Sequence, residues 1–221
     1  MPVDPARVRA LCFDVDGTLS DTDDFYVNRI SRRIARIPGI RHPHRLARRL
    51  VMWMESPGNA LLTLADSVGL DGPMIAAISW GARRRKSRID PPPVVPGVLE
   101  MLQSLHGVYP LAVVSSRDEF STLSFLRERN LLPYFSVVVT VLSAPRTKPF
   151  PDPVRLAARQ LNVDVERCLM VGDTSIDIRS GRSAGSQTVG VLCGFGEEAE
   201  LARQGADSIL ATTADLGTLL A

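Results

Sequence analysis

The stretch that decides the fold is Leu11-Cys12-Phe13-Asp14-Val15-Asp16-Gly17-Thr18-Leu19. The apolar run from Val8 to Phe13 is typical of a buried strand, and two aspartates with one residue between them follow it. Side chains at positions i and i+2 of an extended strand project to the same face, and Gly17 favours a sharp turn directly afterwards. Two carboxylates at the end of a central strand are costly to bury unless they meet a cation or share a proton. The alternative is a solvated turn, in which Asp and Gly are common.

The composition bounds the class of protein. A chain of 221 residues can form one large domain or a domain with a substantial insertion, and its 45% apolar and 23% charged residues are ordinary for a soluble globular protein. The net charge of +2 gives no global electrostatic reason to bind nucleic acid. The start, Met1-Pro2-Val3-Asp4-Pro5, lacks the pattern of a signal peptide. The longest apolar runs, such as 135–144, are roughly half the length of a membrane helix. We therefore expect neither a nucleic-acid nor a membrane partner.

The three cysteines are Cys12, Cys168 and Cys193. They form no CxxC pair, and each lies in or just after a strand-like run. This pattern favours buried free thiols over a metal or redox site. We therefore expect a reducing, cytoplasmic location.

From residue 21 to residue 90 the apolar spacing becomes helical, and the segment ends at the stiff linker Pro91-Pro92-Pro93. A small helical bundle is predicted, with helices at about 25–37, 44–54, 61–68 and 74–80. Between residues 22 and 90 there are thirteen Lys and Arg residues against six Asp and Glu residues, a net charge of +7. This charge either attracts an anionic substrate or forms a solvated helix face, and the second interpretation is favoured. No aromatic residues interleave with the arginines, which argues against stacking on single-stranded nucleic acid.

After the prolines, strand and helix patterns alternate. Strands are predicted at 110–114, 136–141, 167–171 and 187–191, and helices at about 97–106, 118–129, 152–161 and 175–184. Asp118 and Asp152 are the predicted N-caps of two of these helices, and a short helix-strand-helix unit closes the chain. The alternation predicts an α/β fold in which a parallel sheet is covered by helices on both faces.

Polar residues end several of these strands, and the carboxyl ends of parallel strands meet at one edge of a sheet. Asp14 and Asp173 suit Mg²⁺, which prefers oxygen ligands. Ser115 and Lys148 could hold phosphoryl oxygens. A carboxylate can attack phosphorus to give an aspartyl-phosphate, and a second carboxylate nearby could act first as general acid and then as general base.

These motifs, in this order, resemble the haloacid dehalogenase superfamily and, within it, the phosphatases related to phosphoglycolate phosphatase. The resemblance rests on Asp14-Val-Asp16-Gly-Thr-Leu, on Ser115 after an apolar strand, on Lys148-Pro149 and on Gly172-Asp173-x-x-x-Asp177. It implies a doubly wound, Rossmann-like core formed by residues 1–20 and 92–221. It also implies an inserted α-helical cap, residues 21–91, that closes over the substrate and excludes water.

The resemblance also implies a role for each motif residue. Asp14 would be the phosphorylated nucleophile and a Mg²⁺ ligand. Asp16 would be the acid/base, with its backbone carbonyl on the metal. The remaining implied roles are phosphoryl binding by Ser115, Ser116 and Lys148, and Mg²⁺ binding by Asp173 and, directly or through water, Asp177.

Two features leave alternatives open. The predicted strand 110–114 is followed by Ser115-Ser116-Arg117, where the family more usually has a threonine-asparagine type of ending. Arg117 is either a substrate ligand or an exposed residue before a helix. The run from Gly194 to Ala199 matches the dinucleotide pattern G-x-G-x-x-A, but only about 25 residues follow, too few for another βαβ unit. We predict instead a loop that packs beside the active site.

The expected function is Mg²⁺-dependent hydrolysis of a small phosphorylated metabolite, with phosphoglycolate as the best single substrate. A sugar-phosphate mutase of β-phosphoglucomutase type and a pyrophosphatase would use the same core residues. A catalytically idle binding module is the alternative from another class, and the intact Asp14, Asp16, Lys148 and Asp173 argue against it. The protein is expected to be a monomer or a homodimer.

Overall fold

The computed structural model describes residues 2–22 and 91–221, together with Phe25, Val27, Ser31, Ile34, Ala35 and Leu46. The four helices predicted between residues 25 and 80 lie outside the described residues, apart from those isolated positions. The division into a core and a cap therefore stays a prediction.

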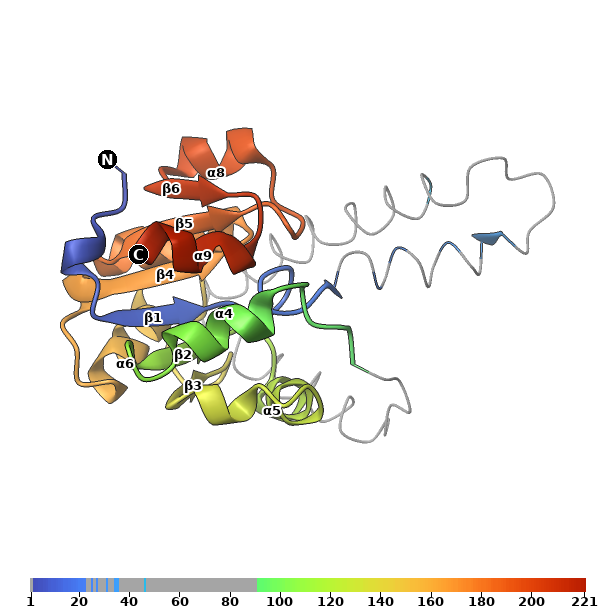
Figure 1. Ribbon diagram of the computed structural model, residues 1–221, viewed down its shortest axis with the longest axis horizontal. Coiled ribbons are helices and arrows are strands. Elements are labelled where there is room, and N and C mark those ends of the chain that lie inside the picture. Colours follow the sequence, from blue (N-terminus) through green and yellow to red (C-terminus); the bar gives the residue numbers. More distant parts are fainter. Residues whose placement is uncertain are drawn as a thin grey trace.

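The described part of the chain is built on one sheet of six strands, in the order β3-β2-β1-β4-β5-β6 (Figure 1). All neighbouring strands are parallel, and in the centre Phe13 pairs with Val113 on one side and with Val171 on the other. The strands are β1 (Ala10–Phe13), β2 (Leu111–Val114), β3 (Val137–Val139), β4 (Cys168–Gly172), β5 (Gln187–Val191) and β6 (Ser208–Leu210). The strand order reverses at β1 and β4, so the crevice at a topological switch point lies at their carboxyl ends.

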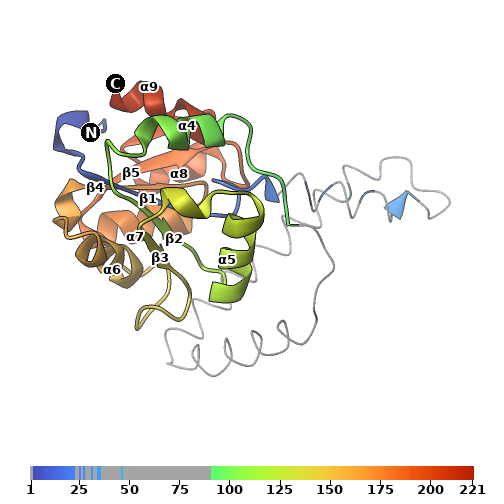
Figure 2. The same cartoon turned by 60° about the horizontal axis from the view of Figure 1, so that its bottom comes forward.

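Helices cover both faces of this sheet, as predicted for a doubly wound α/β fold. Figure 2 shows α4 and α9 on one side of the sheet and α6 and α7 on the other. The helices of the described residues are α4 (Val98–Leu105), α5 (Glu119–Glu128), α6 (Asp152–Gln160), α7 (Ser175–Ala184), α8 (Glu198–Gln204) and α9 (Leu216–Leu220). Short 3₁₀ turns occur at Pro5–Arg7, Leu132–Tyr134, Val165–Arg167 and Thr213–Asp215.

The core follows the two-residue period of the strands. Leu11 and Phe13 of β1 pack with the buried face of α4, whereas Cys12 packs in a second cluster with Val154 and Ala157 of α6. Both sides of β1 are therefore buried, which explains why its sequence is an unbroken apolar run.

Helix capping agrees with the sequence at one predicted position and differs at the other. The Asp118 side chain caps α5, because its Oδ1 accepts a hydrogen bond from the Ser121 backbone N–H at 3.1 Å. Asp152 is not the cap of α6: the cap position is Pro151, and Asp152 is the first helical residue. There it pairs with Arg146 at 3.0 Å, and its negative charge lies at the favourable end of the helix dipole.

The two chain segments on either side of residues 23–90 run next to each other. The Asp21 backbone N–H donates to the Pro93 carbonyl at 2.9 Å, and the Val95 N–H donates to the Leu19 carbonyl at 3.0 Å. The chain thus leaves the core after β1 and returns to it at the same place.

All three cysteines are free. Cys12 and Cys168 are buried, as predicted, and Cys193 is half-buried with its Sγ 3.3 Å from the Gly17 carbonyl oxygen. Within the described residues, no helix combines the length and the apolar character that crossing a membrane requires.

Candidate active site

The chain turns away from the sheet directly after β1, and beyond this turn the two aspartates have different hydrogen-bond partners. The Asp14 N–H still bonds to the Val171 carbonyl of β4 at 2.9 Å. The backbone N–H groups of Leu19 and Ser20 then both donate to the Val15 carbonyl, at 3.0 and 2.9 Å, and Gly17 has a φ of +70°. The strand no longer governs side-chain direction at Asp16, so the two carboxylates do not share one partner.

Three of the predicted carboxylates lie together at the carboxyl ends of β1 and β4. Oxygens of Asp14, Asp173 and Asp177 lie within 4.8 Å of one another, and all three residues are buried. The Nζ of Lys148 donates to Asp14 Oδ1 at 2.7 Å and to Asp177 Oδ1 at 2.6 Å. If all four groups are ionised, this buried cluster carries a net charge of −2.

The start of α7 positions Asp177. Both the backbone N–H and the hydroxyl of Thr174 donate to Asp177 Oδ2, at 3.1 and 2.7 Å. A Cβ at Gly172 would lie 2.3 Å from the Asp177 side chain, so the end of β4 has to be glycine for the carboxylate to reach the cluster.

The loop that carries the G-x-G-x-x-A pattern encloses Asp173. The Phe195 N–H donates to Asp173 Oδ2 at 2.9 Å. Cβ atoms added to Gly17 or Gly194 would each lie 2.2 Å from that same oxygen. The prediction of a loop beside the site is confirmed, and its glycines serve the close approach to a carboxylate.

The cluster is short of positive charge. Burial raises the pKa of Asp14 to about 7; the charge of Lys148 opposes this shift, and the charges of Asp177 and Asp16 add to it. Burial also raises the pKa of Asp173, and the charges of Asp177 and Asp14 add to that effect. Burial lowers the pKa of Lys148, but the charges of Asp14 and Asp177 outweigh it, so the pKa lies above its usual range.

This charge deficit fits a divalent cation. The oxygen donors of Asp14, Asp173 and Asp177 are close enough to share one ion, and carboxylate oxygens are the ligands that Mg²⁺ prefers. A charge of +2 would balance the net charge of −2 of the buried cluster.

Asp16 lies at the rim of the cluster. Its Oδ2 accepts a hydrogen bond from Arg117 Nε at 2.6 Å, and its Oδ1 accepts from Arg117 Nη2 and, at 2.8 Å, from the Thr22 hydroxyl. Neither sequence interpretation of Arg117 included this ion pair, and Arg117 is not an exposed residue, because its side chain is only 18% accessible. In the sequence, only the position of Thr22 shortly after the Asp14-Val-Asp16-Gly-Thr-Leu motif pointed to a role at the site.

The two serines differ in their surroundings. Ser115 is buried, and its Oγ accepts a hydrogen bond from the Arg117 N–H at 3.1 Å. Ser116 is exposed and lines a cavity of about 140 Å³ over the carboxylates. The cavity is lined by Asp14, Asp16, Ser116, Lys148, Asp173, Thr174, Ile176, Asp177 and Phe195. Sequence reasoning missed Thr174 and Ile176, which carry no charge to mark them, and it predicted the loop that contains Phe195 but gave Phe195 itself no role.

The chain belongs to the haloacid dehalogenase-like hydrolase family, whose sequence profile matches residues 11–191. The phosphoglycolate phosphatase of Neisseria meningitidis is 39% identical over 107 residues, which are 48% of this chain and 45% of that protein. That match therefore spans less than half of the relative's length. The pyrophosphatase PpaX of Bacillus pumilus is 26% identical over 212 residues, which are 96% of this chain and 95% of that protein.

The solved structures agree on the fold. A haloacid dehalogenase-like hydrolase of Streptococcus pneumoniae superimposes with a TM-score of 0.70 at 20% identity, and the match covers 98% of this chain and 100% of that one.

Proposed function

We propose that this protein is a Mg²⁺-dependent phosphatase that hydrolyses a small phosphate monoester through phosphorylated Asp14. The observation that carries the proposal is the pairing of a buried carboxylate with a cation at the floor of the cavity. Lys148 occupies Asp14 Oδ1, and no described residue donates a hydrogen bond to Asp14 Oδ2. Lys148 thus holds Oδ1 of Asp14 in place, and Oδ2 is the oxygen that can attack phosphorus.

In the first step, a carboxylate oxygen of Asp14 attacks phosphorus and the P–O bond to the substrate alcohol breaks. Asp16 donates a proton to the leaving oxygen, so the alcohol leaves uncharged. Lys148 and the hydroxyl of Ser116 lie on the cavity wall, where they bind phosphoryl oxygens. Ser115 is the third proposed phosphoryl ligand, because its Oγ accepts a hydrogen bond from the Arg117 N–H and its hydroxyl hydrogen is left to donate.

In the second step, Asp16 takes a proton from water, and the water oxygen attacks phosphorus. The P–O bond to Asp14 breaks, orthophosphate leaves, and Asp16 again holds its proton. Hydrolysis is thereby split into two displacements that use the same pair of aspartates.

Asp14, Asp173 and Asp177, together with the backbone carbonyl of Asp16, are the proposed holders of Mg²⁺, which supplies positive charge to the phosphoryl oxygens when bound. Thr174 and the Phe195 N–H fix two of these carboxylates through the hydrogen bonds described above.

The relatives support phosphoglycolate as the first substrate to test, because several phosphoglycolate phosphatases match this chain. Pyrophosphate is the second candidate, and the match to the pyrophosphatase PpaX over nearly its whole length favours it. Both substrates carry a second anionic group next to the phosphoryl group that is transferred.

The test is phosphate release by wild-type protein and Asp14→Asn from phosphoglycolate, sugar phosphates, nucleotides and pyrophosphate, each with Mg²⁺ and with EDTA. Glu100→Gln, which removes one negative charge from the exposed surface of α4, is the matched control. We expect turnover with Mg²⁺ that Asp14→Asn lowers by a factor on the order of 10⁴ or more.

Turnover that survives Asp14→Asn would show that Asp14 is not the nucleophile. Conversion of a sugar phosphate to an isomer without free phosphate would instead identify a mutase. If no substrate reacts, the protein is better described as a binding module.

A further inference from the structure

We propose that Arg117 recognises a second anionic group of the substrate, and that binding this group releases the Asp16 carboxylate that Arg117 now holds. The inference rests on the proposed function and narrows its substrate class. The substrates would be phosphate monoesters or anhydrides with a carboxylate or a second phosphate near the reacting phosphoryl group.

The first support is the form of the ion pair. Arg117 meets Asp16 with two nitrogens, Nε and Nη2, one for each carboxylate oxygen. This two-pronged arrangement is the geometry in which a guanidinium binds any carboxylate or phosphate. A substrate anion that reaches the same edge of the guanidinium therefore competes directly with Asp16.

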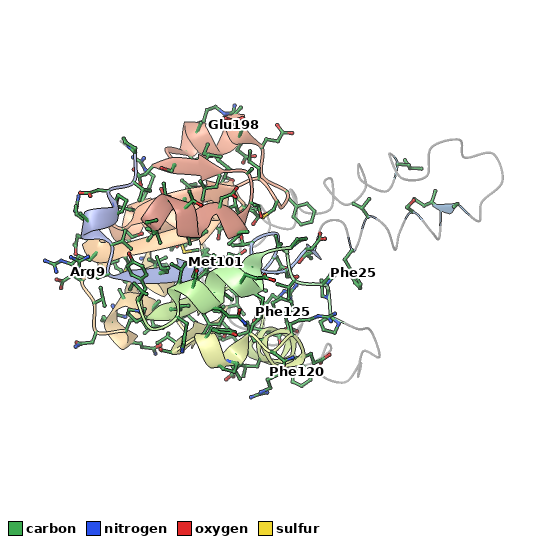
Figure 3. The ribbon with its side chains drawn as sticks, viewed as in Figure 1. Arg9, Phe25, Met101, Phe120, Phe125 and Glu198 are labelled. Atoms are coloured by element: carbon green, nitrogen blue, oxygen red, sulfur yellow. The ribbon has the colours of Figure 1, made fainter. Side chains whose placement is uncertain are left out.

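The second support is the fixed position of Arg117. Its backbone N–H donates to Ser115 Oγ at 3.1 Å, and its carbonyl accepts from the Val141 N–H at 3.0 Å. Its guanidinium carbon lies 5.7 Å from the centre of the Phe125 ring, which is buried on α5 and labelled in Figure 3. Because the arginine is anchored and stacked, the more exposed Asp16 is the partner that moves when the pair opens.

The third support is the distribution of charge around the cavity. Four carboxylates line it, and the one ammonium among its lining residues, Lys148, is already bound between Asp14 and Asp177. A bound Mg²⁺ would balance the buried cluster of Asp14, Asp173, Asp177 and Lys148 but not the charge of Asp16, so a second anionic group beside Asp16 is repelled unless a further cation meets it. Arg117 contacts Asp16 and follows Ser116, and both of these residues line the cavity, so its charge lies at the rim where such a group would enter.

A permanent ion pair that only orients Asp16 is the competing explanation. Such a pair would affect all substrates equally, because Asp16 acts on the leaving oxygen of every one of them. Anion recognition instead makes the effect of Arg117 depend on the substrate, so matched substrate pairs separate the two explanations.

The first experiment measures binding by calorimetry in the presence of Mg²⁺ and needs no turnover. The probes are 3-phosphonopropanoate and propylphosphonate, which differ by a carboxylate in place of a methyl group. We expect wild-type protein to bind the carboxylated probe at least about tenfold more tightly, as for a hydrogen-bonded charge pair. Arg117→Gln should remove most of this preference, and Arg117→Lys should keep part of it.

Asp16→Asn tests the competition directly. Removing the internal carboxylate should strengthen binding of 3-phosphonopropanoate more than binding of propylphosphonate. Relief of general repulsion would also favour the more highly charged probe, so Asp16→Asn is combined with Arg117→Gln as the control. An equal gain for both probes in Asp16→Asn, or the same extra gain for 3-phosphonopropanoate in the double variant, would overturn the exchange between Asp16 and the substrate.

The second experiment compares kcat/KM for phosphoglycolate and ethyl phosphate, which differ in the same way. In Arg117→Gln, the ratio of kcat/KM for phosphoglycolate to kcat/KM for ethyl phosphate should fall about tenfold or more. The main cause should be a higher KM for phosphoglycolate. The same ratio should be unchanged in Arg127→Gln. Arg127 is an exposed arginine on α5, so this variant is the control for loss of one positive charge. Equal losses on both substrates would overturn the recognition role.

The outcomes separate this inference from the proposed function. Equal binding of the two phosphonates by wild-type protein overturns the inference even if phosphate is released. A carboxylate preference that requires Arg117, without release of phosphate from any substrate, supports the inference and overturns the phosphatase.

Discussion

The Nζ of Lys148 lies 2.7 Å from Oδ1 of Asp14, although 134 positions separate the two residues in the chain. The same ammonium lies 2.6 Å from Asp177 Oδ1, and its side chain is only 3% accessible. One ammonium thus faces a cluster of three buried carboxylates. We expect the stability of this site, its dependence on pH and its affinity for a divalent cation to follow from that imbalance.

Lys148→Met should destabilise the protein strongly in the absence of divalent cations. Methionine keeps the length of the side chain but leaves Asp14 and Asp177 without their cation, and loss of one partner of a buried pair costs about 3–5 kcal/mol. The loss should be present at pH 8, because the stabilising contribution of a lysine with a raised pKa persists up to its ordinary pKa, near 10. Urea unfolding in EDTA measures it.

Arg155→Met is the control for Lys148→Met, because it replaces an exposed basic side chain by the same residue. Mg²⁺ should restore part of the stability lost in Lys148→Met. An unfolding free energy equal to that of wild type in EDTA would contradict the charge imbalance inferred for the cluster.

The stability of the metal-free protein should fall as the pH rises from about 4 to 8. The pKa of Asp14 is raised from 3.8 to about 7, so the folded state favours the protonated carboxyl. Its contribution is fully present below the unfolded pKa and is lost as the pH rises through the folded pKa, by a few kcal/mol in total. Asp173, whose pKa is also raised, acts with the same sign.

Mg²⁺ should therefore raise the melting temperature more at pH 8 than at pH 5, where protonated carboxyls bind the cation poorly. In EDTA, Asp14→Asn should be more stable than wild type at pH 8 and should show a shallower pH dependence. Identical pH profiles for the two proteins would exclude Asp14 as the titrating group.

Gly194→Ala should weaken Mg²⁺ binding. The added Cβ would lie 2.2 Å from Asp173 Oδ2, so either the carboxylate or the loop that holds it has to shift. Gly217→Ala, on α9, is the matched control, because its nearest neighbour, Ser104 Oγ, would be 3.9 Å away. Calorimetric titration with Mg²⁺ measures the difference, and equal affinities in the two variants would refute the enclosure of Asp173.

Thr22→Val should lower kcat about tenfold, on the scale of one hydrogen bond to a charged group. The hydroxyl of Thr22 donates to Asp16 Oδ1 at 2.8 Å, and valine keeps its shape without the donor. Thr22→Ser, which keeps the hydroxyl, should retain most of the activity. In contrast to Arg117→Gln, Thr22→Val should lower kcat by the same factor for phosphoglycolate and for ethyl phosphate. A fall for phosphoglycolate alone would mean that Thr22 helps to recognise the substrate carboxylate.

The sequence was sufficient for the sheet, because strands buried on both sides are apolar runs and each has its own turn signals. The core strands β1, β2, β4 and β5 were predicted to within about two residues. The predicted strand 136–141 is shorter at its end, because Thr140 and Ser143 hydrogen-bond to each other in a turn. Asp152 was misplaced as a cap because Asp is common both at the cap and in the first helical turn.

The candidate site shows the same division. The sequence by itself determined which carboxylates and which lysine come to the ends of the strands, because strand order and direction bring Asp14, Lys148, Asp173 and Asp177 to one edge. Only the tertiary structure decided which partner each side chain takes. The turn after β1 directs Asp16 to Arg117, and the packing of a distant loop brings the Phe195 N–H to Asp173. Strand and helix patterns arise from near neighbours, whereas the partner of a charged side chain can come from a separate element, 22 positions away for Asp173 and Phe195 and 101 positions away for Asp16 and Arg117.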